Sequence, residues 1–291
     1  MTRRKRQAEN DAILKRLRVR RMTRGDVDFA IELATKQGWN PGIHDAECFY
    51  AADPDGFFVG ELDGEPIGCV SAVAYSESFG IMGLYIVKPK FRGMGLGSRM
   101  FEKGLAYLEG RNVGGDSVLQ QEEYYRRYGF RRAHFSYRYE GVGGGSMPAG
   151  VVDISQIPFD ELAVYDAAVF SCPRPRFLKC WIDQPEGRAL AVVENGRLAG
   201  YGVIRRCRKG YKIAPLFADD PRLAQRLFDA LRSHALGKPV FMDTPEPNMA
   251  AVALAARHKM KVVFQTLRTY NKGKPPIPLE RVYGMTSFEL G

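Results

Sequence analysis

The sequence has no apolar run near the roughly 20 residues that a membrane-spanning helix needs. Its basic N-terminus is followed by no apolar segment, so we expect no secretory signal. The five cysteines lack C-x-x-C spacing and are scattered along the chain: Cys48, Cys69, Cys172, Cys180 and Cys207. Because scattered thiols in odd number are typical of a reducing compartment, we expect free cysteines in a cytoplasmic protein.

Histidine is equally scarce. The four histidines show no metal-site or triad spacing, so we interpret them as structural and expect no metal: His44, His134, His234 and His258. A hydrophobic content of 45% in 291 residues is typical of a globular chain. That length accommodates two domains of roughly 130 to 150 residues, each with an adequate core.

The positive charge is concentrated at the N-terminus. Residues 1–24 hold eight Arg and two Lys against one Glu and one Asp, which is +8 of the formal net charge of +10. A basic arm over residues 1–16 is compatible with nucleic-acid binding, but we favour a solvated leader. The remaining chain carries only +2, so a nucleic-acid partner is not expected from it.

A glycine-rich stretch joins an apolar strand pattern at 81–87 to a helical pattern at 98–109. A strand, a tight turn and a helix in this order aim unpaired backbone N–H groups and the positive end of the helix dipole at one point. Gly93, Gly95 and Gly97 have no Cβ, so the backbone can approach an anion closely. The stretch therefore predicts a phosphate or pyrophosphate site.

The glycine spacing matches neither the G-x-G-x-x-G dinucleotide fingerprint nor a Walker loop ending in Gly-Lys-Ser/Thr. It resembles the acyl-CoA pyrophosphate loop of the GNAT superfamily of N-acyltransferases, through Val87-Lys88-Pro89 and Arg92-Gly93-Met94-Gly95-Leu96-Gly97. A later family motif matches Tyr125-Arg126-Arg127-Tyr128-Gly129-Phe130, although Val118 replaces the motif's Asn. The resemblance implies a GNAT domain over 17–141. Its expected strands are 17–22, 57–62, 67–75, 81–87, 117–119 and 135–139, and its expected helices 26–37, 45–52, 98–109 and 122–128.

The resemblance implies acetyl-CoA as cosubstrate. The implied cofactor-binding residues are Tyr85, Ile86, Val87, Arg92, Gly93, Met94, Gly95, Leu96, Gly97 and Ser98. Backbone N–H groups near 85–87 would stabilise the charge that develops on the thioester oxygen. Tyr125 lies where the family often places its general acid, a role that suits a phenol of pKa ~10. The alternative for Tyr125 is packing within a tyrosine-rich helix.

Many GNAT enzymes carry a general base Glu on the strand before the loop, but 81–87 contains no carboxylate. A water chain or a group from the other half of the chain must then serve. The missing carboxylate favours a second reading, in which the protein binds acyl-CoA without turnover.

Residues 151–291 repeat the order of elements after a glycine-rich linker at 142–150, which we expect to be flexible. Expected helices are 157–170, 221–236 and 249–258, and expected strands 189–194, 198–205, 211–217, 240–243 and 262–267. In place of the glycine loop stands Ala218-Asp219-Asp220-Pro221-Arg222-Leu223, whose two carboxylates would repel a pyrophosphate. We therefore expect an α/β (α+β) chain of two tandem GNAT-like domains, each with a mixed, mostly antiparallel sheet flanked by helices. The second is a degenerate domain that forms a substrate wall.

An acidic loop follows the expected strand at 240–243. We expect Asp243 and Glu246 to hold the ammonium group of the acceptor, with one of them helping to remove its proton. A capping role, in which Asp243 or Asn248 holds the next helix, fits the loop equally well.

The sequence as a whole predicts an acetyl-CoA-dependent N-acetyltransferase that modifies a primary amine of a small molecule between the two domains. The alternative is a non-catalytic acyl-CoA-binding or nucleic-acid-associated regulatory protein that uses the basic arm. Tyr125 opposes that alternative. No membrane partner is expected, and nothing in the sequence specifies an oligomeric state.

Overall fold

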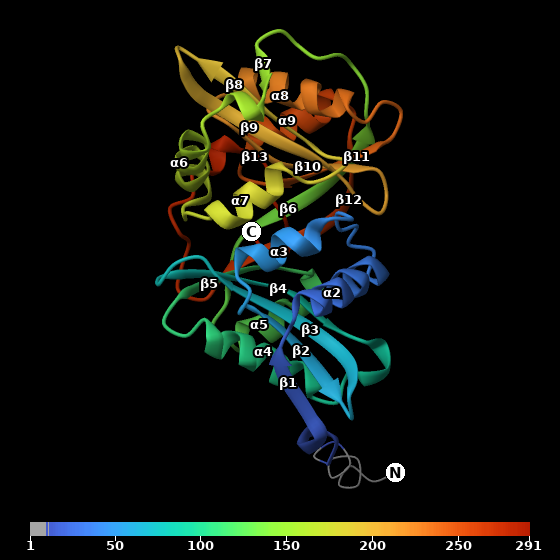
Figure 1. Cartoon of the computed structure of the whole chain (residues 1–291). Coiled ribbons are helices and arrows are strands. Elements are labelled where there is room, and N and C mark those ends of the chain that lie inside the picture. The colour runs from blue at the N-terminus through green and yellow to red at the C-terminus, as the bar shows by residue number, and fades with distance from the viewer. Residues whose placement is uncertain (1–9, 11) are drawn as a thin grey trace.

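The computed structural model describes residue 10 and residues 12–291. The two halves of the chain lie at opposite ends of an elongated molecule, and the C-terminal end of the chain lies between them (Figure 1). Most of the expected basic arm, residues 1–9 and 11, lies outside the described residues. Within residues 12–16, which are helical, Arg16 donates a hydrogen bond of 2.9 Å to Asp63.

Local sequence signals account for most elements of the first half. These elements are β1 (Leu17–Arg21), α2 (Arg24–Lys36), α3 (Asp45–Ala52), β2 (Phe57–Leu62), β3 (Glu65–Ala74), β4 (Phe79–Val87), α4 (Leu96–Tyr107), β5 (Asn112–Ser117), α5 (Glu122–Arg126) and β6 (Arg131–Val142). A capping box between Thr23 and Asp26 begins α2. Asp63 and Gly64, with φ of 52° and 82°, form the tight turn between β2 and β3.

The second half repeats this order with its own caps. Its elements are β7 (Val151–Asp153), α6 (Phe159–Phe170), α7 (Pro175–Ile182), β8 (Arg188–Glu194), β9 (Arg197–Arg206), β10 (Tyr211–Ala218), α8 (Pro221–Ser233), β11 (Pro239–Pro245), α9 (Met249–Arg257), β12 (Lys261–Tyr270) and β13 (Val282–Gly284). Asp220 caps α8 by accepting from the Leu223 N–H, and Asn248 caps α9 by accepting from the Ala251 N–H.

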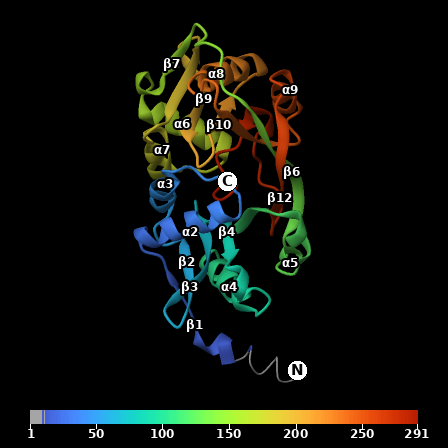
Figure 2. The same ribbon diagram turned by 90° about the vertical axis from the view of Figure 1, so that its right-hand side faces the viewer.

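Helices cover both faces of the sheet in the first half. Val59 and Cys69 share a core with α2, whereas their neighbours Phe58 and Val70 share a core with α4. Successive side chains of a strand point to opposite faces, so α2 and α4 lie on opposite sides of β2 and β3. Figure 2 shows this layering. The expected mixed sheet flanked by helices is confirmed.

The described strands form one continuous sheet rather than two. Their order is β1-β2-β3-β4-β5-β12-β6-β11-β10-β9-β8-β7, with β13 paired to β10. Only the β4–β5 and β10–β11 neighbours run parallel among the described pairs. The strand β12 comes from the end of the chain yet lies between β5 and β6, where Leu267 pairs with Ser117 and with Phe135. The C-terminal half thus completes the sheet of the first.

The segment expected to be a flexible linker is held by hydrogen bonds. The Gly143 N–H donates to the Lys238 carbonyl at 2.8 Å, and the Gly144 N–H donates to the Arg232 carbonyl at 3.0 Å. A Cβ on Gly143 would lie 2.0 Å from the Ala235 carbonyl oxygen. This glycine therefore permits a close approach to the end of α8, while the flexibility expected of residues 142–150 stays a prediction.

The strand expected at 117–119 is misplaced, because β5 occupies Asn112–Ser117. β5 contains two consecutive glycines, Gly114 and Gly115, and such a pair is more typical of a turn than of a strand. A Cβ on Gly114 would lie 2.7 Å from the Tyr270 ring, and one on Gly115 would lie 2.9 Å from the Met82 carbonyl. The glycines thus allow neighbouring strands to pack tightly, which only the tertiary structure reveals.

Cys48 of α3 and Cys180 of α7 form a disulfide that joins the two halves, with their Cα atoms 5.2 Å apart. The expectation that all five thiols are reduced is wrong for this pair. The two cysteines are 132 residues apart, so their spacing carried no signal. The stacked rings of Phe49 and Trp181, 6.2 Å between centroids, lie at the same helix–helix contact.

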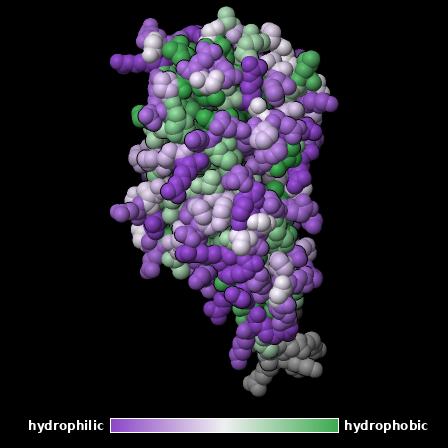
Figure 3. All heavy atoms as spheres, in the orientation of Figure 1, coloured by the Kyte–Doolittle hydropathy of each residue, from purple (hydrophilic) through white to green (hydrophobic). Residues whose placement is uncertain are grey.

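Apolar residues lie mostly inside the described structure. No helix among residues 12–291 is long and apolar enough to cross a membrane. The face drawn in Figure 3 is largely hydrophilic, with smaller hydrophobic patches. The largest core cluster spans both halves and includes Phe49, Trp181 and Leu290.

Candidate active site

β4 and β5 separate partway along their length. They pair from Phe79 with Asn112 to Met82 with Gly115, after which β4 continues to Val87 beside β3 alone. A shift in the β3–β4 register accompanies this separation, and Leu84 there has a φ of 45°. A bulge of this kind redirects the strand. The later residues of β4 consequently line a cavity instead of pairing with β5.

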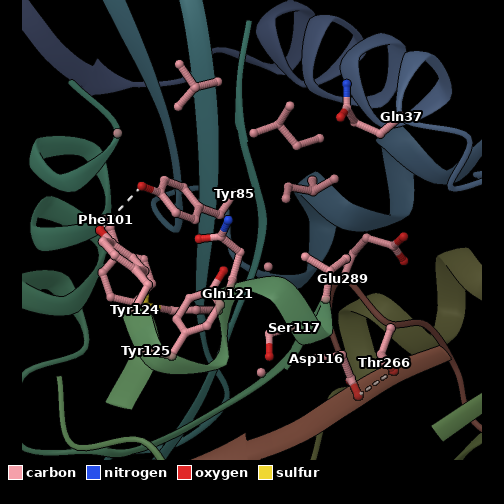
Figure 4. A pocket seen from close by; sticks show the side chains of 18 of the residues that line it. Gln37, Tyr85, Phe101, Asp116, Ser117, Gln121, Tyr124, Tyr125, Thr266 and Glu289 are labelled. Carbon is pink, nitrogen blue, oxygen red and sulfur yellow. Dashed lines mark hydrogen bonds between the residues drawn. The ribbon is translucent and has the colours of Figure 1, made fainter. Parts of the chain in front are cut away.

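The cavity has a volume of about 590 Å³ and is lined by both halves of the chain (Figure 4). The first half contributes the end of β4, the glycine loop, Trp39 and the tyrosines of α5. The second half contributes side chains of β12 and of the segment after β13: Phe264, Thr266, Thr269, Phe288 and Glu289.

The glycine loop leaves the start of α4 open. Gly93 and Gly95 have φ of 76° and 79°, a left-handed region that favours glycine. Gly95 is the N-cap, no described side chain accepts from the first turn at that position, and the turn contains no acidic residue. Exposed N–H groups at a helix N-terminus form an anion site, so the loop fits a pyrophosphate.

The Arg92 side chain holds this loop in place. Arg92 donates from Nε to the Val87 carbonyl at 2.8 Å and from a terminal nitrogen to Gln37, the C-cap of α2, at 3.0 Å. A Cβ on Gly97 would lie 2.5 Å from the Tyr85 hydroxyl oxygen. Gly97 thus leaves room for Tyr85 against the start of α4.

The structure brings most of the expected cofactor-binding residues together. Eight of the ten line the cavity: Tyr85, Ile86, Val87, Arg92, Gly93, Gly95, Gly97 and Ser98. Met94 and Leu96 do not line it, and Leu96 is fully buried in the core beneath α4. Their contact with the cofactor therefore lacks support, while cofactor binding by the other eight stays a prediction.

Tyr125 lines the cavity and packs against Phe101, with 5.4 Å between ring centroids. Burial raises the pKa of Tyr125 above its usual range, so the phenol keeps its proton at neutral pH. The neighbouring Tyr124, which sequence reasoning did not single out, accepts from the Tyr85 hydroxyl at 3.3 Å (Figure 4). It also donates to the Ser98 hydroxyl at 3.3 Å. Burial raises the pKa of Tyr85 and of Tyr124 to about 12.

Asp243 and Glu246 do not line the cavity. The fully buried Asp243 accepts two hydrogen bonds from Arg138, at 2.6 and 2.7 Å, with the Lys212 Nζ 3.8 Å away. Burial alone would raise the pKa of Asp243, but the two cations outweigh it and lower that pKa. Glu246 accepts from the Tyr137 hydroxyl at 3.3 Å.

The prediction that Asp243 holds the acceptor is therefore wrong, because its carboxylate is buried and paired with Arg138, whereas the same role for Glu246 lacks support from the cavity lining. Sequence reasoning placed an acidic loop at a strand end but had no means of seeing that Arg138, on a neighbouring strand, neutralises Asp243. The alternative capping role is confirmed for Asn248, which holds the start of α9 and also donates to the Val282 carbonyl at 3.0 Å.

The corresponding position in the second half is occupied by the chain itself. Asp220 accepts from the Leu223 N–H at 2.9 Å, at the helix end where a pyrophosphate would bind. Its carboxylate therefore takes the place of an anionic ligand. Asp219 beside it accepts from Arg281 and Tyr165.

Of the described residues, two carboxylates line the cavity, Asp116 and Glu289. Asp116 is paired with Arg268 and accepts from the Thr266 hydroxyl at 3.4 Å. Glu289 is 4% exposed, and its carboxylate forms no hydrogen bond or ion pair with a described residue. Sequence reasoning missed both, because no local pattern connects them with the glycine loop.

Comparison with known proteins agrees with this geometry. Residues 27–130 match the acetyltransferase (GNAT) family, and residues 162–284 match an acetyltransferase (GNAT) domain. Holothin acyltransferase from Pseudoalteromonas sp. (strain SANK 73390) is 30% identical over 264 residues, which cover 89% of this chain and 90% of that protein. The chain belongs to the GNAT superfamily. It is therefore an acyltransferase by family, as the loop and tyrosine motifs predicted.

Solved structures show a similar fold over most of this chain. A putative acetyltransferase from Pyrococcus horikoshii has a TM-score of 0.82 at 24% identity and covers 95% of this chain and 96% of that one. A tandem GNAT protein from the clavulanic acid biosynthesis pathway has a TM-score of 0.62 at 15% identity, covering 89% and 99%. Both likenesses concern the fold, and they confirm the expected tandem arrangement.

Proposed function

We propose that this GNAT protein transfers the acetyl group of acetyl-CoA to a primary amine of a small molecule. One observation carries the proposal. Three features border the same cavity: the start of α4, which no described side chain caps; the end of β4, which no longer pairs with β5; and the phenol of Tyr125. An anion site, a backbone edge and a protonated phenol in one cavity are the parts that acyl transfer from a CoA thioester requires.

The geometry supports a division of roles along the cavity. N–H groups of the glycine loop would bind the pyrophosphate of the cosubstrate, and its thioester arm would extend beside the unpaired end of β4. Backbone N–H groups near 85–87 would stabilise the developing negative charge on the carbonyl oxygen. Tyr125 would donate a proton to the departing thiolate, a role that suits a phenol whose burial keeps it protonated.

The far side of the cavity suggests the acceptor. Trp39, Phe264 and Phe288 supply aromatic surface there, and the volume of about 590 Å³ falls in the range typical of small-molecule sites. These features favour a small amine with a planar apolar part over a macromolecular acceptor. The relative named holothin acyltransferase makes holothin one of the acceptors to test.

The experiment measures free thiol release from acetyl-CoA and from longer acyl-CoA esters across a panel of amines that includes holothin. We expect amine-dependent release, fastest with acetyl-CoA, and a product heavier by one acetyl group in mass spectrometry. Acyl-CoA binding without thiol release for any amine would instead support the non-catalytic alternative. The cytoplasmic location stays a prediction, and the Cys48–Cys180 disulfide removes one of its premises.

A further inference from the structure

The segment after β13, residues 285–291, crosses from the second half to the first and is buried throughout. It is fixed at both ends. The Met285 N–H donates to the Asp243 carbonyl at 2.7 Å, and the Tyr75 hydroxyl donates to the Leu290 carbonyl at 2.8 Å. The segment therefore occupies one defined position between the halves.

Glu289 lies against β4 at the point where that strand leaves β5. A Cβ on Gly83 would lie 2.0 Å from the Glu289 carbonyl oxygen, and the Ser71 hydroxyl donates to the same oxygen at 3.5 Å. Gly83 directly follows Met82, the last residue of β4 that pairs with β5. The backbone of Glu289 is thus held beside the residues of β4 that would face the thioester.

The Glu289 side chain borders the same cavity as Tyr125. In Figure 4, Glu289 and Asp116 lie on one side of the cavity and Tyr124 and Tyr125 on the other. Asp116 is committed to Arg268, whereas the Glu289 carboxylate has no hydrogen-bonding or ion-pair partner among residues 12–291. A carboxylate that is almost wholly buried and has no partner in the described part of the chain is free to bind a ligand or a proton.

Charged groups on five elements surround Glu289: Lys212 on β10, Arg138 on β6, Arg205 on β9, Asp45 on α3 and Asp243 on β11. Burial raises the pKa of Glu289; Lys212 and Arg138 oppose this rise, Asp45 and Asp243 add to it, and the pKa stays raised. A carboxylate with a raised pKa accepts a proton more readily near neutral pH than an ordinary Glu does. Glu289 therefore has the properties of a base.

We propose that Glu289 is the general base of the transfer, taking the place of the carboxylate that β4 lacks. This inference rests on the proposed function. Glu289 takes one proton from the bound ammonium group and later releases it to solvent. The neutral amine nitrogen then bonds to the acetyl carbon as the carbon–sulfur bond breaks, and the departing thiolate takes the phenol proton of Tyr125. The excess proton on the amide nitrogen returns to Tyr125, so ammonium and acetyl-CoA give amide, free CoA and one proton.

The test compares Glu289→Gln with Glu280→Gln, the same change at an exposed carboxylate before β13. Thiol release is measured against pH with acetyl-CoA and the best acceptor of the wild-type protein. At neutral pH, Glu289→Gln should lower kcat/KM for the amine about 100-fold. The loss should shrink as the pH approaches the pKa of the amine, since free amine then forms in solution. Glu280→Gln should behave as the wild type does.

Calorimetry should give the same acetyl-CoA affinity for both variants and the wild type. A loss that is constant across the pH range would indicate a packing role and overturn the proposal, as would a kcat/KM within threefold of wild type. If Glu289→Gln fails to fold, Glu289→Asp decides, because it retains the charge but withdraws the carboxylate by one methylene. We expect that variant to be at least about tenfold slower, and a wild-type rate would overturn the proposal. Absence of turnover in the wild type itself would refute the proposed function first.

Discussion

Arg138 and Asp243 face each other on the neighbouring strands β6 and β11 and form a doubly hydrogen-bonded ion pair, with side chains 3% and 0% exposed. Arg138 also donates to the Trp39 carbonyl. The pair thus connects the second half to a cavity-lining segment of the first. This contact explains why an acidic residue at a strand end is not available to a substrate.

Loss of the Asp243 charge should destabilise the protein strongly. We expect Asp243→Asn to lower the free energy of unfolding by about 3–5 kcal/mol in urea titrations, because the Arg138 charge is left buried without its partner. Glu246→Gln, on the surrounding loop, should change it by less than about 0.5 kcal/mol. Equal effects of the two changes on stability would contradict the assignment of Asp243 to a buried ion pair with Arg138.

The same pair predicts a dependence of stability on pH. The pKa of Asp243 is lowered in the folded protein. Its contribution is therefore fully present above the unfolded pKa of about 3.9 and is lost as the pH falls through the folded value. The difference in unfolding free energy between wild type and Asp243→Asn should shrink in acid. A difference that grows in acid would mean that the pKa of Asp243 is raised, not lowered, in the folded protein.

The glycine loop can be tested with a matched pair of substitutions. Gly93 and Gly64 have similar φ, 76° and 82°, and a Cβ on either would meet no atom within 4 Å. Gly93→Asp and Gly64→Asp should thus cost similar stability. Only Gly93→Asp should weaken acetyl-CoA binding, by at least about tenfold or about 1.4 kcal/mol in calorimetry, because it adds negative charge beside the pyrophosphate site. If the two variants bind acetyl-CoA equally well, the glycine loop is not part of the binding site.

Removal of the Tyr125 hydroxyl should slow the chemical step. We expect Tyr125→Phe to lower kcat about 100-fold with little change in the KM for acetyl-CoA, because the phenol acts as the thiolate forms. Tyr128→Phe is the control: Tyr128 packs on the same Phe101, at 4.8 Å between centroids, but does not line the cavity. Similar losses in both variants would return Tyr125 to a packing role.

The disulfide predicts a response to reducing agents. Denatured, unreduced protein should show three free thiols, and reduced protein five. Reduction should lower the free energy of unfolding of the wild type by about 2–5 kcal/mol, since the bond closes a long loop. Cys180→Ser should be less stable and should not respond further to reduction. Five thiols before reduction would show that the bond is absent in solution.

The sequence alone determined the features that depend on neighbours along the chain. Gly93 and Gly95 adopt the left-handed backbone that their spacing indicated, Asp63-Gly64 forms its hairpin turn, and Thr23 caps α2. Each depends on local sterics or on hydrogen bonds within a few residues. The glycine loop, Tyr125 and the family resemblance were therefore predictable without coordinates.

Only the tertiary structure decided which distant groups meet. The insertion of β12 between β5 and β6, the bond from Cys48 to Cys180 and the placement of Glu289 beside Gly83 all join segments more than 100 residues apart. The role open to a carboxylate likewise depends on its neighbours. Asp243 forms an ion pair with Arg138, whereas Glu289 lines the cavity. Burial and pairing are properties of the packed molecule, because the chemistry of an acidic side chain is set by the charges and solvent around it.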